Sequence, residues 1–216
     1  MTDKNKKASS KVETLQRIVD AARSEFADKG IAKARVESIA TTAGVTKQLI
    51  YHYYQSKEQL FACVLDESSS NAMSRLIDKN YADKTPREAL KDFIHDFSTP
   101  FKDPELATLA MEGIHYHDSH STPRNQFKEQ SPVLLEKFSE ILKRGIDSGD
   151  FRADFCAKQL FAALGVIATG PFTNRYLMSV LTGVEADSVD EKERWADFSF
   201  QIMLSALEYK RTPEQI

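Results

Sequence analysis

Residues 36–57 read V-E-S-I-A-T-T-A-G-V-T-K-Q-L-I-Y-H-Y-Y-Q-S-K, and this stretch decides the fold. The spacing of its apolar residues predicts a short helix over 36–43, which Gly44 breaks. A second helix is predicted from about 46 to 53, with Lys, Gln, His and Tyr side chains on its free face. Two short helices joined by a glycine turn are typical of a helix-turn-helix, which places its second helix in the major groove of DNA. The stretch therefore predicts a DNA-binding unit.

Helical signals continue on both sides of this unit. Predicted helix starts are marked by capping boxes or by proline at the first helical position; they lie at Ser10, Ser56, Thr85, Asp103, Ser131 and Ser188. The first helix is expected to end at Lys29-Gly30. A long apolar helix over 157–181 is expected to kink at Gly170-Pro171, where proline removes a backbone hydrogen bond. No stretch shows the alternation of a strand, so the sequence predicts an all-α protein of about nine helices.

The net charge of −3 is distributed unevenly along the chain. Residues 1–60 hold 11 Lys and Arg against 7 Asp and Glu, a net charge of +4. Residues 61–216 hold 18 against 25, a net charge of −7. A basic N-terminal quarter that coincides with the helix-turn-helix fits a module that contacts phosphates.

Composition also indicates where the protein acts. The N-terminus is polar and Lys-rich with no apolar segment behind it, so we expect no signal peptide. The longest apolar run, residues 160–172, is too short to span a membrane. Cys63 and Cys156 have no short spacing, which favours neither a disulfide scaffold nor a zinc site. We therefore expect a cytoplasmic protein that does not associate with membranes.

Enzymatic chemistry finds no support in the sequence. It contains no glycine-rich phosphate loop, no nucleophile elbow and no Cys–His pairing at useful spacing, so we predict no catalytic residue, no cofactor and no metal ligand. A helical adaptor that binds only protein is an alternative, which the polar face of the second helix disfavours. A second alternative is a metal-responsive regulator that uses the cluster His115, His117 and His120. Only a helix end or a loop could bring these three onto one metal ion.

Residues 35–60 read R-V-E-S-I-A-T-T-A-G-V-T-K-Q-L-I-Y-H-Y-Y-Q-S-K-E-Q-L. In apolar spacing, turn glycine and the aromatic ending before Ser-Lys, they resemble the pattern T-V-x-x-I-A-x-x-A-G-V-S-x-x-x-L-Y-x-H-F-x-S-K-E-x-L of the TetR/AcrR family of bacterial transcriptional regulators. The match needs no gap, and the order of the later helices is similar to the family's ligand-binding domain. Arg35, Leu49 and Tyr53 depart from the pattern, which affects the expected operator sequence more than the fold.

The resemblance implies which residues meet DNA. The first residues of the recognition helix reach base edges, where Gln suits adenine, Lys suits guanine and Leu can meet a thymine methyl group. Aromatic residues later in this helix, and the lysine that begins the next one, contact phosphates. The DNA-binding residues predicted in this way are Arg35, Thr46, Lys47, Gln48, Leu49, Tyr51, His52, Tyr53 and Lys57.

The resemblance also implies a DNA-binding domain over residues 1–56 and a ligand-binding and dimerisation domain over 57–216. The protein would be a homodimer on a near-palindromic operator of double-stranded DNA, and a repressor that a small hydrophobic or aromatic effector releases. The expected effector contacts are Phe93, Phe97, Met111, His115, Tyr116, Phe172 and Tyr176. The expected dimer interface contains Phe161, Leu164, Trp195, Phe198, Ile202 and Leu207.

Overall fold

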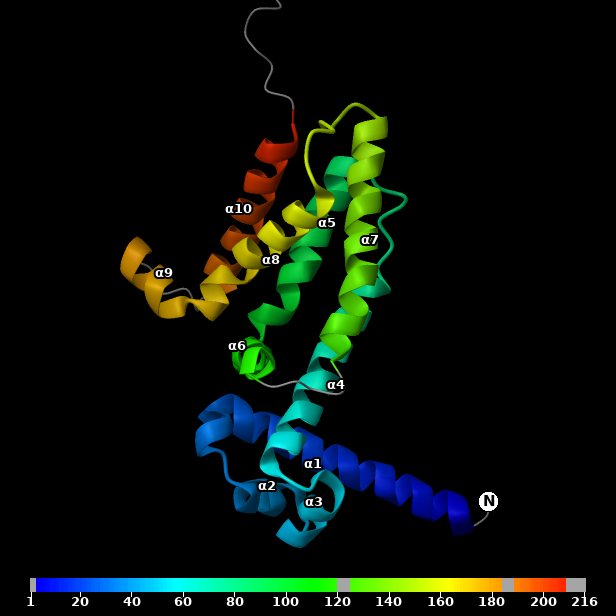
Figure 1. Cartoon of the computed structure of the whole chain (residues 1–216), viewed down its shortest axis with the longest axis vertical. Helices are drawn as coiled ribbons and strands as arrows, with labels where there is room; N and C mark the ends of the chain where they lie inside the picture. The colour runs from blue at the N-terminus through cyan, green and yellow to red at the C-terminus, as the bar shows by residue number, and fades with distance from the viewer. Residues whose placement is uncertain (1–2, 120–124, 184–188, 209–216) are drawn as a thin grey trace, which may run out of the picture. The chain divides into compact units, whose positions relative to one another are not determined.

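The computed structural model describes residues 3–119, 125–183 and 189–208. These ranges form ten α-helices and one short 3-10 helix, and they contain no strand. The all-α prediction is therefore confirmed, with one α-helix more than expected. The chain divides into two compact units (Figure 1). Unit 1 comprises Met1–Ser70 and Pro104–Gln126, and unit 2 comprises Asn71–Asp103 and Phe127–Ile216.

Unit 1 is built around the two short helices. It contains α1 (Asp3–Lys33), α2 (Val36–Ala43), α3 (Lys47–Tyr54), the first part of α4 (Lys57–Ile77), and α6 (Pro104–Ser119). Their apolar faces bury one core that includes Phe26, Ile39, Ile50 and Phe61. The rings of Phe26 and Phe61 meet edge to face at 5.0 Å, an arrangement that aromatic pairs favour. α1 contacts both α2 and α6, so one long helix supports the rest of the unit (Figure 1).

The helix-turn-helix lies where the sequence predicts it. Gly44 closes α2 in the left-handed conformation (φ 66°), which glycine adopts without steric cost. Thr46 caps α3, because its hydroxyl accepts the backbone N–H of Leu49 at 3.2 Å. Both ends of the turn are thus determined by residues within the motif itself.

The start of α1 differs from the prediction. α1 already begins at Asp3, and the Ser10 carbonyl accepts a hydrogen bond from the Thr14 hydroxyl at 2.8 Å. The capping-box prediction is wrong here because the preceding polar residues continue the helix through Ser10. Gly30 does interrupt the helix (φ 68°, ψ 164°), after which one more turn runs to Lys33.

Unit 2 has its own core. It contains the end of α4, α5 (Pro86–Ser98), η1 (Thr99–Lys102), nearly all of α7 (Gln126–Asp147), α8 (Ala157–Thr173), α9 (Arg175–Thr182) and α10 (Val189–Leu207). α10 packs beside α5 and α8, and α9 turns off the end of α8 (Figure 1). The core is rich in aromatic side chains, among them Phe93, Phe138 and Phe151. The capping box of α5 is confirmed, because Thr85 and Glu88 each accept the other's backbone N–H, at 3.3 and 3.1 Å.

Two helix boundaries correct the prediction. α7 begins at Gln126 rather than at Ser131, because the Asp66 carboxylate on α4 accepts the backbone N–H of Gln126 at 2.8 Å. The helix expected over 157–181 is two helices, since the non-helical backbone of Asn174 (φ −127°, ψ 39°) separates α8 from α9. The start predicted at Ser188 lies outside the described residues.

Candidate nucleic-acid interface

The first turn of α3 exposes its side chains to solvent, while a buried residue later in the helix packs into the core of unit 1. Ile50 is buried in the core of unit 1, with 1% of its side chain exposed. Lys47 and Gln48 are exposed, and Leu49 is half-buried. Because Thr46 caps the helix and Ile50 anchors it, the Lys47 and Gln48 side chains project from a rigid support, as reading of base edges requires.

Lys47 is tied to two neighbours on this surface. Its ammonium group forms an ion pair with the Glu37 carboxylate in the first turn of α2. It also lies 5.6 Å from the centroid of the Tyr51 ring, a cation–π distance. The hydrogen bond between the two charged groups raises the pKa of Lys47 and lowers the pKa of Glu37. Both side chains are exposed, so a bound molecule such as DNA could contact the ion pair directly.

The aromatic residues of α3 differ in how much surface they offer. Tyr51 and His52 are exposed, whereas Tyr53 and Tyr54 are half-buried against the core of unit 1. The centroids of the Tyr53 and His52 rings lie 5.1 Å apart. The Lys11 ammonium group lies 5.3 Å from the centroid of the Tyr53 ring. Burial raises the pKa of Tyr54 to about 12, which agrees with its place against the core of unit 1.

Lys57 has a structural role that the sequence does not reveal. Its ammonium group donates hydrogen bonds to the carbonyl oxygens of Ala32 and Ala34, at 3.4 and 3.2 Å. Ala32 lies in the last turn of α1, and Ala34 lies in the segment that joins α1 to α2. A phosphate contact by Lys57 would therefore share the ammonium group with this segment.

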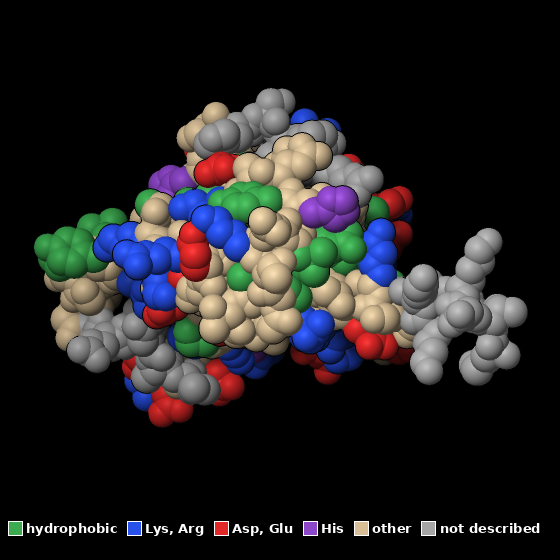
Figure 2. Space-filling view, turned by 90° about the horizontal axis from the view of Figure 1, so that it is seen from below, with side chains coloured by type: hydrophobic (Ala, Val, Ile, Leu, Met, Phe, Trp, Pro, Cys, Tyr) green, Lys and Arg blue, Asp and Glu red, His purple; other side chains and the backbone are tan. Residues whose placement is uncertain are grey.

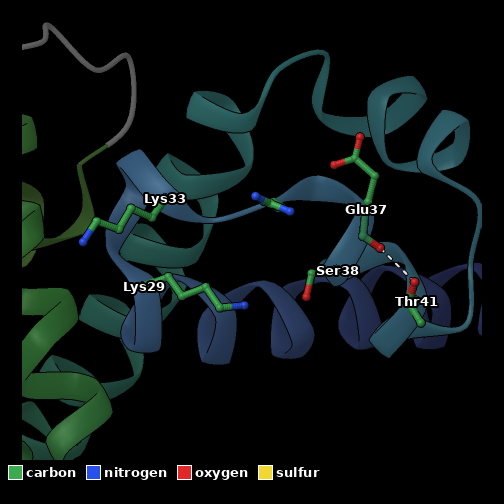
Figure 3. Close-up of a pocket in the computed structure, with 6 residues that line it drawn as sticks. Lys29, Lys33, Glu37, Ser38 and Thr41 are labelled. Atoms are coloured by element: carbon green, nitrogen blue, oxygen red, sulfur yellow. Dashed lines mark hydrogen bonds between the residues drawn. The ribbon is translucent and has the colours of Figure 1, made fainter.

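A basic depression adjoins α2, and sequence reasoning identified only part of it. It has a volume of about 560 Å³. Figure 3 shows Lys29 and Lys33 reaching from α1, with Ser38 and Thr41 on α2; the Glu37 side chain points to the other side of α2. The spacing of Lys29, Lys33 and Arg35 beside the motif was the available signal. The residues that line the depression are Lys29, Lys33, Arg35, Glu37, Ser38 and Thr41.

Arg35 is exposed at the N-cap of α2, and its side chain makes no capping hydrogen bond. Figure 2 views the molecule from the side on which α2 and α3 lie. Lys and Arg side chains lie on several sides of a broad uncharged surface in this view, and an acidic side chain lies among them. This distribution suits a surface that meets phosphates on either side of a groove.

The residues predicted to contact an effector are divided between the two units. Phe93 and Phe97 belong to the aromatic core of unit 2, where their rings stack at 6.3 Å. Phe172 stacks on Phe101 at 5.6 Å in the same unit. Tyr176 on α9 is exposed. The remaining three, Met111, His115 and Tyr116, lie on α6 in unit 1.

One residue near Phe172 was missed by sequence reasoning. Lys192 is a lysine with only 6% of its surface exposed. Its ammonium group donates to the Lys102 carbonyl at 3.2 Å and lies 5.7 Å from the centroid of the Phe172 ring. Periodicity offers no signal for it, because a lysine in a polar first turn is ordinarily solvated.

The predicted dimer residues divide by exposure. Leu164 and Leu207 are fully buried in the core of unit 2, and Phe161 packs against that core. Trp195 is half-buried and donates from Nε1 to the Ile167 carbonyl at 2.7 Å. Phe198 and Ile202 on α10 are 50% and 38% exposed. Of these residues, Phe198 and Ile202 thus offer most apolar surface to a second chain.

The His115 cluster is only partly described. His115 is exposed on α6, and His120 lies outside the described residues. Within the described part of the chain, no group of three or more His, Cys, Asp or Glu side chains could hold a metal ion. None of the helices in these ranges is long and apolar enough to cross a membrane.

Relatives named as transcriptional repressors are similar to this chain in sequence. The chain is 28% identical over 200 residues to the HTH-type transcriptional repressor NicS of Pseudomonas putida, which covers 90% of this chain and 92% of that protein. It is 54% identical over 54 residues to the HTH-type transcriptional repressor SCO4008 of Streptomyces coelicolor, which covers 25% of this chain and 28% of that protein.

Solved structures share the fold. FadR from Bacillus subtilis in complex with stearoyl-CoA superposes with a TM-score of 0.67 at 21% identity, over 88% of this chain and 98% of that chain. HlyIIR, a hemolysin II transcriptional regulator, superposes with a TM-score of 0.58 at 25% identity, over 91% of this chain and 98% of that chain.

Two family models cover most of the chain. The model described as bacterial regulatory proteins, tetR family, matches residues 18–64, which contain the helix-turn-helix. The model described as tetracyclin repressor-like, C-terminal domain, matches residues 86–203. Since the second match alone spans more than half of the sequence, the chain belongs to the tetR family of bacterial regulatory proteins.

Proposed function

We propose that this protein is a dimeric, sequence-specific repressor that binds a near-palindromic operator and leaves it when a small hydrophobic or aromatic effector binds. It acts in the cytoplasm, where bacterial DNA lies, and it catalyses no reaction. The observation that carries the proposal is the first turn of α3, where exposed Lys47 and Gln48 follow the Thr46 cap and stand above buried Ile50.

The two functions would be divided between two consecutive parts of the sequence. Residues 1–56 would read DNA, and residues 57–216 would bind the effector and the second subunit. Base contacts would come from Lys47, Gln48 and Leu49, with Arg35, Thr46, Tyr51, His52, Tyr53 and Lys57 at the backbone. In a homodimer the two α3 helices would enter successive major grooves of one face of the duplex.

Repression and release are supported by relatives. NicS is a transcriptional repressor, and the FadR structure contains stearoyl-CoA. The core of unit 2 is apolar and includes several aromatic side chains, so an apolar effector is the class that would fit among them. Within unit 1, α6 packs on α1, and the Ser24 hydroxyl on α1 donates to the Glu105 carboxylate on α6 at 3.3 Å. A displacement of α6 would therefore reach the helices that hold α2 and α3.

Nuclease protection of the DNA just upstream of the protein's own gene tests the proposal. Two protected half-sites, spaced by one helical turn or a multiple of it, are expected on one face of the duplex. Protection of a single site would contradict the dimer. Uniform weak protection of all sequences would contradict sequence-specific reading and favour the adaptor or a non-specific DNA-binding protein.

A further inference from the structure

The α2–α3 surface carries a single carboxylate. Between residues 36 and 54, Glu37 is the one acidic residue, while Lys47 is the one lysine. A carboxylate on a surface that approaches phosphates repels them, and it lowers affinity for every DNA sequence. Its presence in the first turn of α2 therefore calls for a role other than solubility.

The position of Glu37 is fixed by local geometry. It lies one turn before Thr41, whose hydroxyl donates to the Glu37 carbonyl at 2.9 Å (Figure 3). Its carboxylate reaches across the turn to the Lys47 ammonium group at the start of α3. Lys47 in turn lies over the Tyr51 ring. The lysine is thus held between a carboxylate on α2 and an aromatic ring on its own helix.

The ion pair contributes little to the stability of the fold. Both side chains are largely exposed, at 63% for Glu37 and 46% for Lys47, and exposed pairs stabilise proteins weakly. A free lysine is a mobile point charge that can swing to any phosphate within its reach. A lysine that is paired with Glu37 must leave this pair before it can bind a phosphate. The protein therefore makes one phosphate contact fewer with non-specific DNA.

We propose that Glu37 is a specificity-determining residue, which acts by competing with DNA phosphates for the Lys47 ammonium group. This inference rests on the proposed function. On random DNA the pair persists and the carboxylate repels the backbone, which keeps affinity low. On the operator, base contacts by α3 hold the helix in the groove. There, Glu37 and the Tyr51 ring already orient the Lys47 side chain. Discrimination between operator and random DNA increases as a result.

The test compares the variant Glu37→Gln with the wild type on two DNA probes. One is a duplex that the wild-type protein enriches from a random-sequence library, and the other is an unselected random duplex. For random DNA we expect affinity to rise about five- to tenfold per subunit at low salt, with the salt dependence steeper by about 0.9 per subunit in log–log slope. For the enriched duplex the gain should be clearly smaller, so the specificity ratio falls.

Two further variants locate the effect. Glu140→Gln removes the same charge from an exposed position on α7 and should change neither affinity. In a Lys47→Ala background, Glu37→Gln should lose the part of its effect on random DNA that comes from releasing Lys47, and it should keep only the part that comes from removing a charge that repels phosphates. An effect of equal size in that background would overturn the role of Lys47.

Other outcomes also decide the matter. An unchanged specificity ratio for Glu37→Gln would overturn the proposal. Weaker binding to the enriched duplex with unchanged binding to random DNA would also overturn it, since Glu37 would then be reading a base such as cytosine. If the wild type enriches no sequence at all, the proposed function fails, and this result is visible before any variant is made.

Discussion

The Glu25 carboxylate on α1 accepts the backbone N–H of Arg35 at 3.1 Å and the Ser38 hydroxyl at 2.9 Å. α2 is therefore capped from another helix, because the residue at its N-cap, Arg35, makes no capping bond with its own side chain. Lys29 completes the arrangement with an ion pair to Glu25 at 2.7 Å. This carboxylate ties the start of α2 to α1.

Replacement of Glu25 by Ala should destabilise unit 1. The loss of a cap and of two further hydrogen bonds at a side chain that is only 9% exposed should cost about 1–2 kcal/mol. Urea unfolding followed by circular dichroism measures it. Glu13→Ala is the matched control on the same helix, since Glu13 is exposed and accepts a hydrogen bond from the Ser9 hydroxyl at 2.9 Å. Equal losses in both variants would contradict the cap.

The same carboxylate predicts a pH dependence. Burial by itself raises the pKa of Glu25, but the hydrogen bonds from Lys29, Arg35 and Ser38 outweigh burial and hold the pKa below its usual value. A lowered pKa in the folded state means that the stabilisation is present above the unfolded pKa and is lost as the pH falls through the folded one. The stability difference between wild type and Glu25→Gln should therefore shrink below about pH 4. A difference that grows on acidification would refute this.

Gly145 on α7 should not tolerate a side chain. A Cβ atom placed there would lie 2.0 Å from Cδ2 of Phe151, a ring that is 2% exposed in the core of unit 2. Gly145→Ala should lower the free energy of unfolding by about 1–3 kcal/mol through overpacking. Lys143→Ala on the same helix, at a side chain 74% exposed, should stay within about 0.5 kcal/mol of the wild type. A neutral Gly145→Ala would show that Phe151 can move away.

Gln48 and Lys57 should affect DNA binding in different ways. Gln48→Ala should relax the preference at one base position, at a cost of about 1–3 kcal/mol there. Lys57→Ala should weaken binding to all sequences and reduce the salt slope by about one contact per subunit. Lys57 also donates hydrogen bonds to the Ala32 and Ala34 carbonyls. The free energy of unfolding of the Lys57→Ala variant must therefore be measured together with its DNA affinity. Equal effects of both variants on random DNA would contradict the assigned roles.

The exposed apolar surface of α10 should hold the dimer together. Phe198→Glu places a charge on a side chain that is 50% exposed, and it should reduce the mass in solution to that of one chain, because an unpaired charge in an apolar interface is costly. Light scattering at micromolar concentration measures this. Val12→Glu, at a 65% exposed position in unit 1, is the control and should keep the wild-type mass. A Phe198→Glu dimer would place the interface elsewhere.

Sequence reasoning succeeded where the determinants are local. Gly44 and the Thr46 cap lie inside the motif, so α2 and α3 could be predicted closely. The capping box at Thr85 and Glu88 is local as well. The start of α7 could not be predicted, because Asp66, its cap, lies 60 residues away in the sequence. Ser10 misled for the opposite reason: a local capping pattern lies within a helix that continues through it.

The same distinction applies to the candidate interface. Exposure of Lys47 and Gln48 follows from the helical period, but the bonds of Lys57 to the α1–α2 segment and the capture of Lys47 by Glu37 depend on how helices pack. Aromatic periodicity could not separate effector contacts from core. Phe93 is fully buried, whereas Tyr176 is 83% exposed, and both fall on apolar helical stripes.

The central claim, that the first turn of α3 reads a specific DNA sequence, is tested most directly by fluorescence anisotropy. The purified protein is titrated onto labelled DNA from just upstream of its own gene, across a salt series and with random DNA as competitor. We expect tight binding that resists the competitor and that Gln48→Ala weakens. Absence of binding at low salt, or binding that random DNA displaces equally in wild type and variant, would contradict the claim.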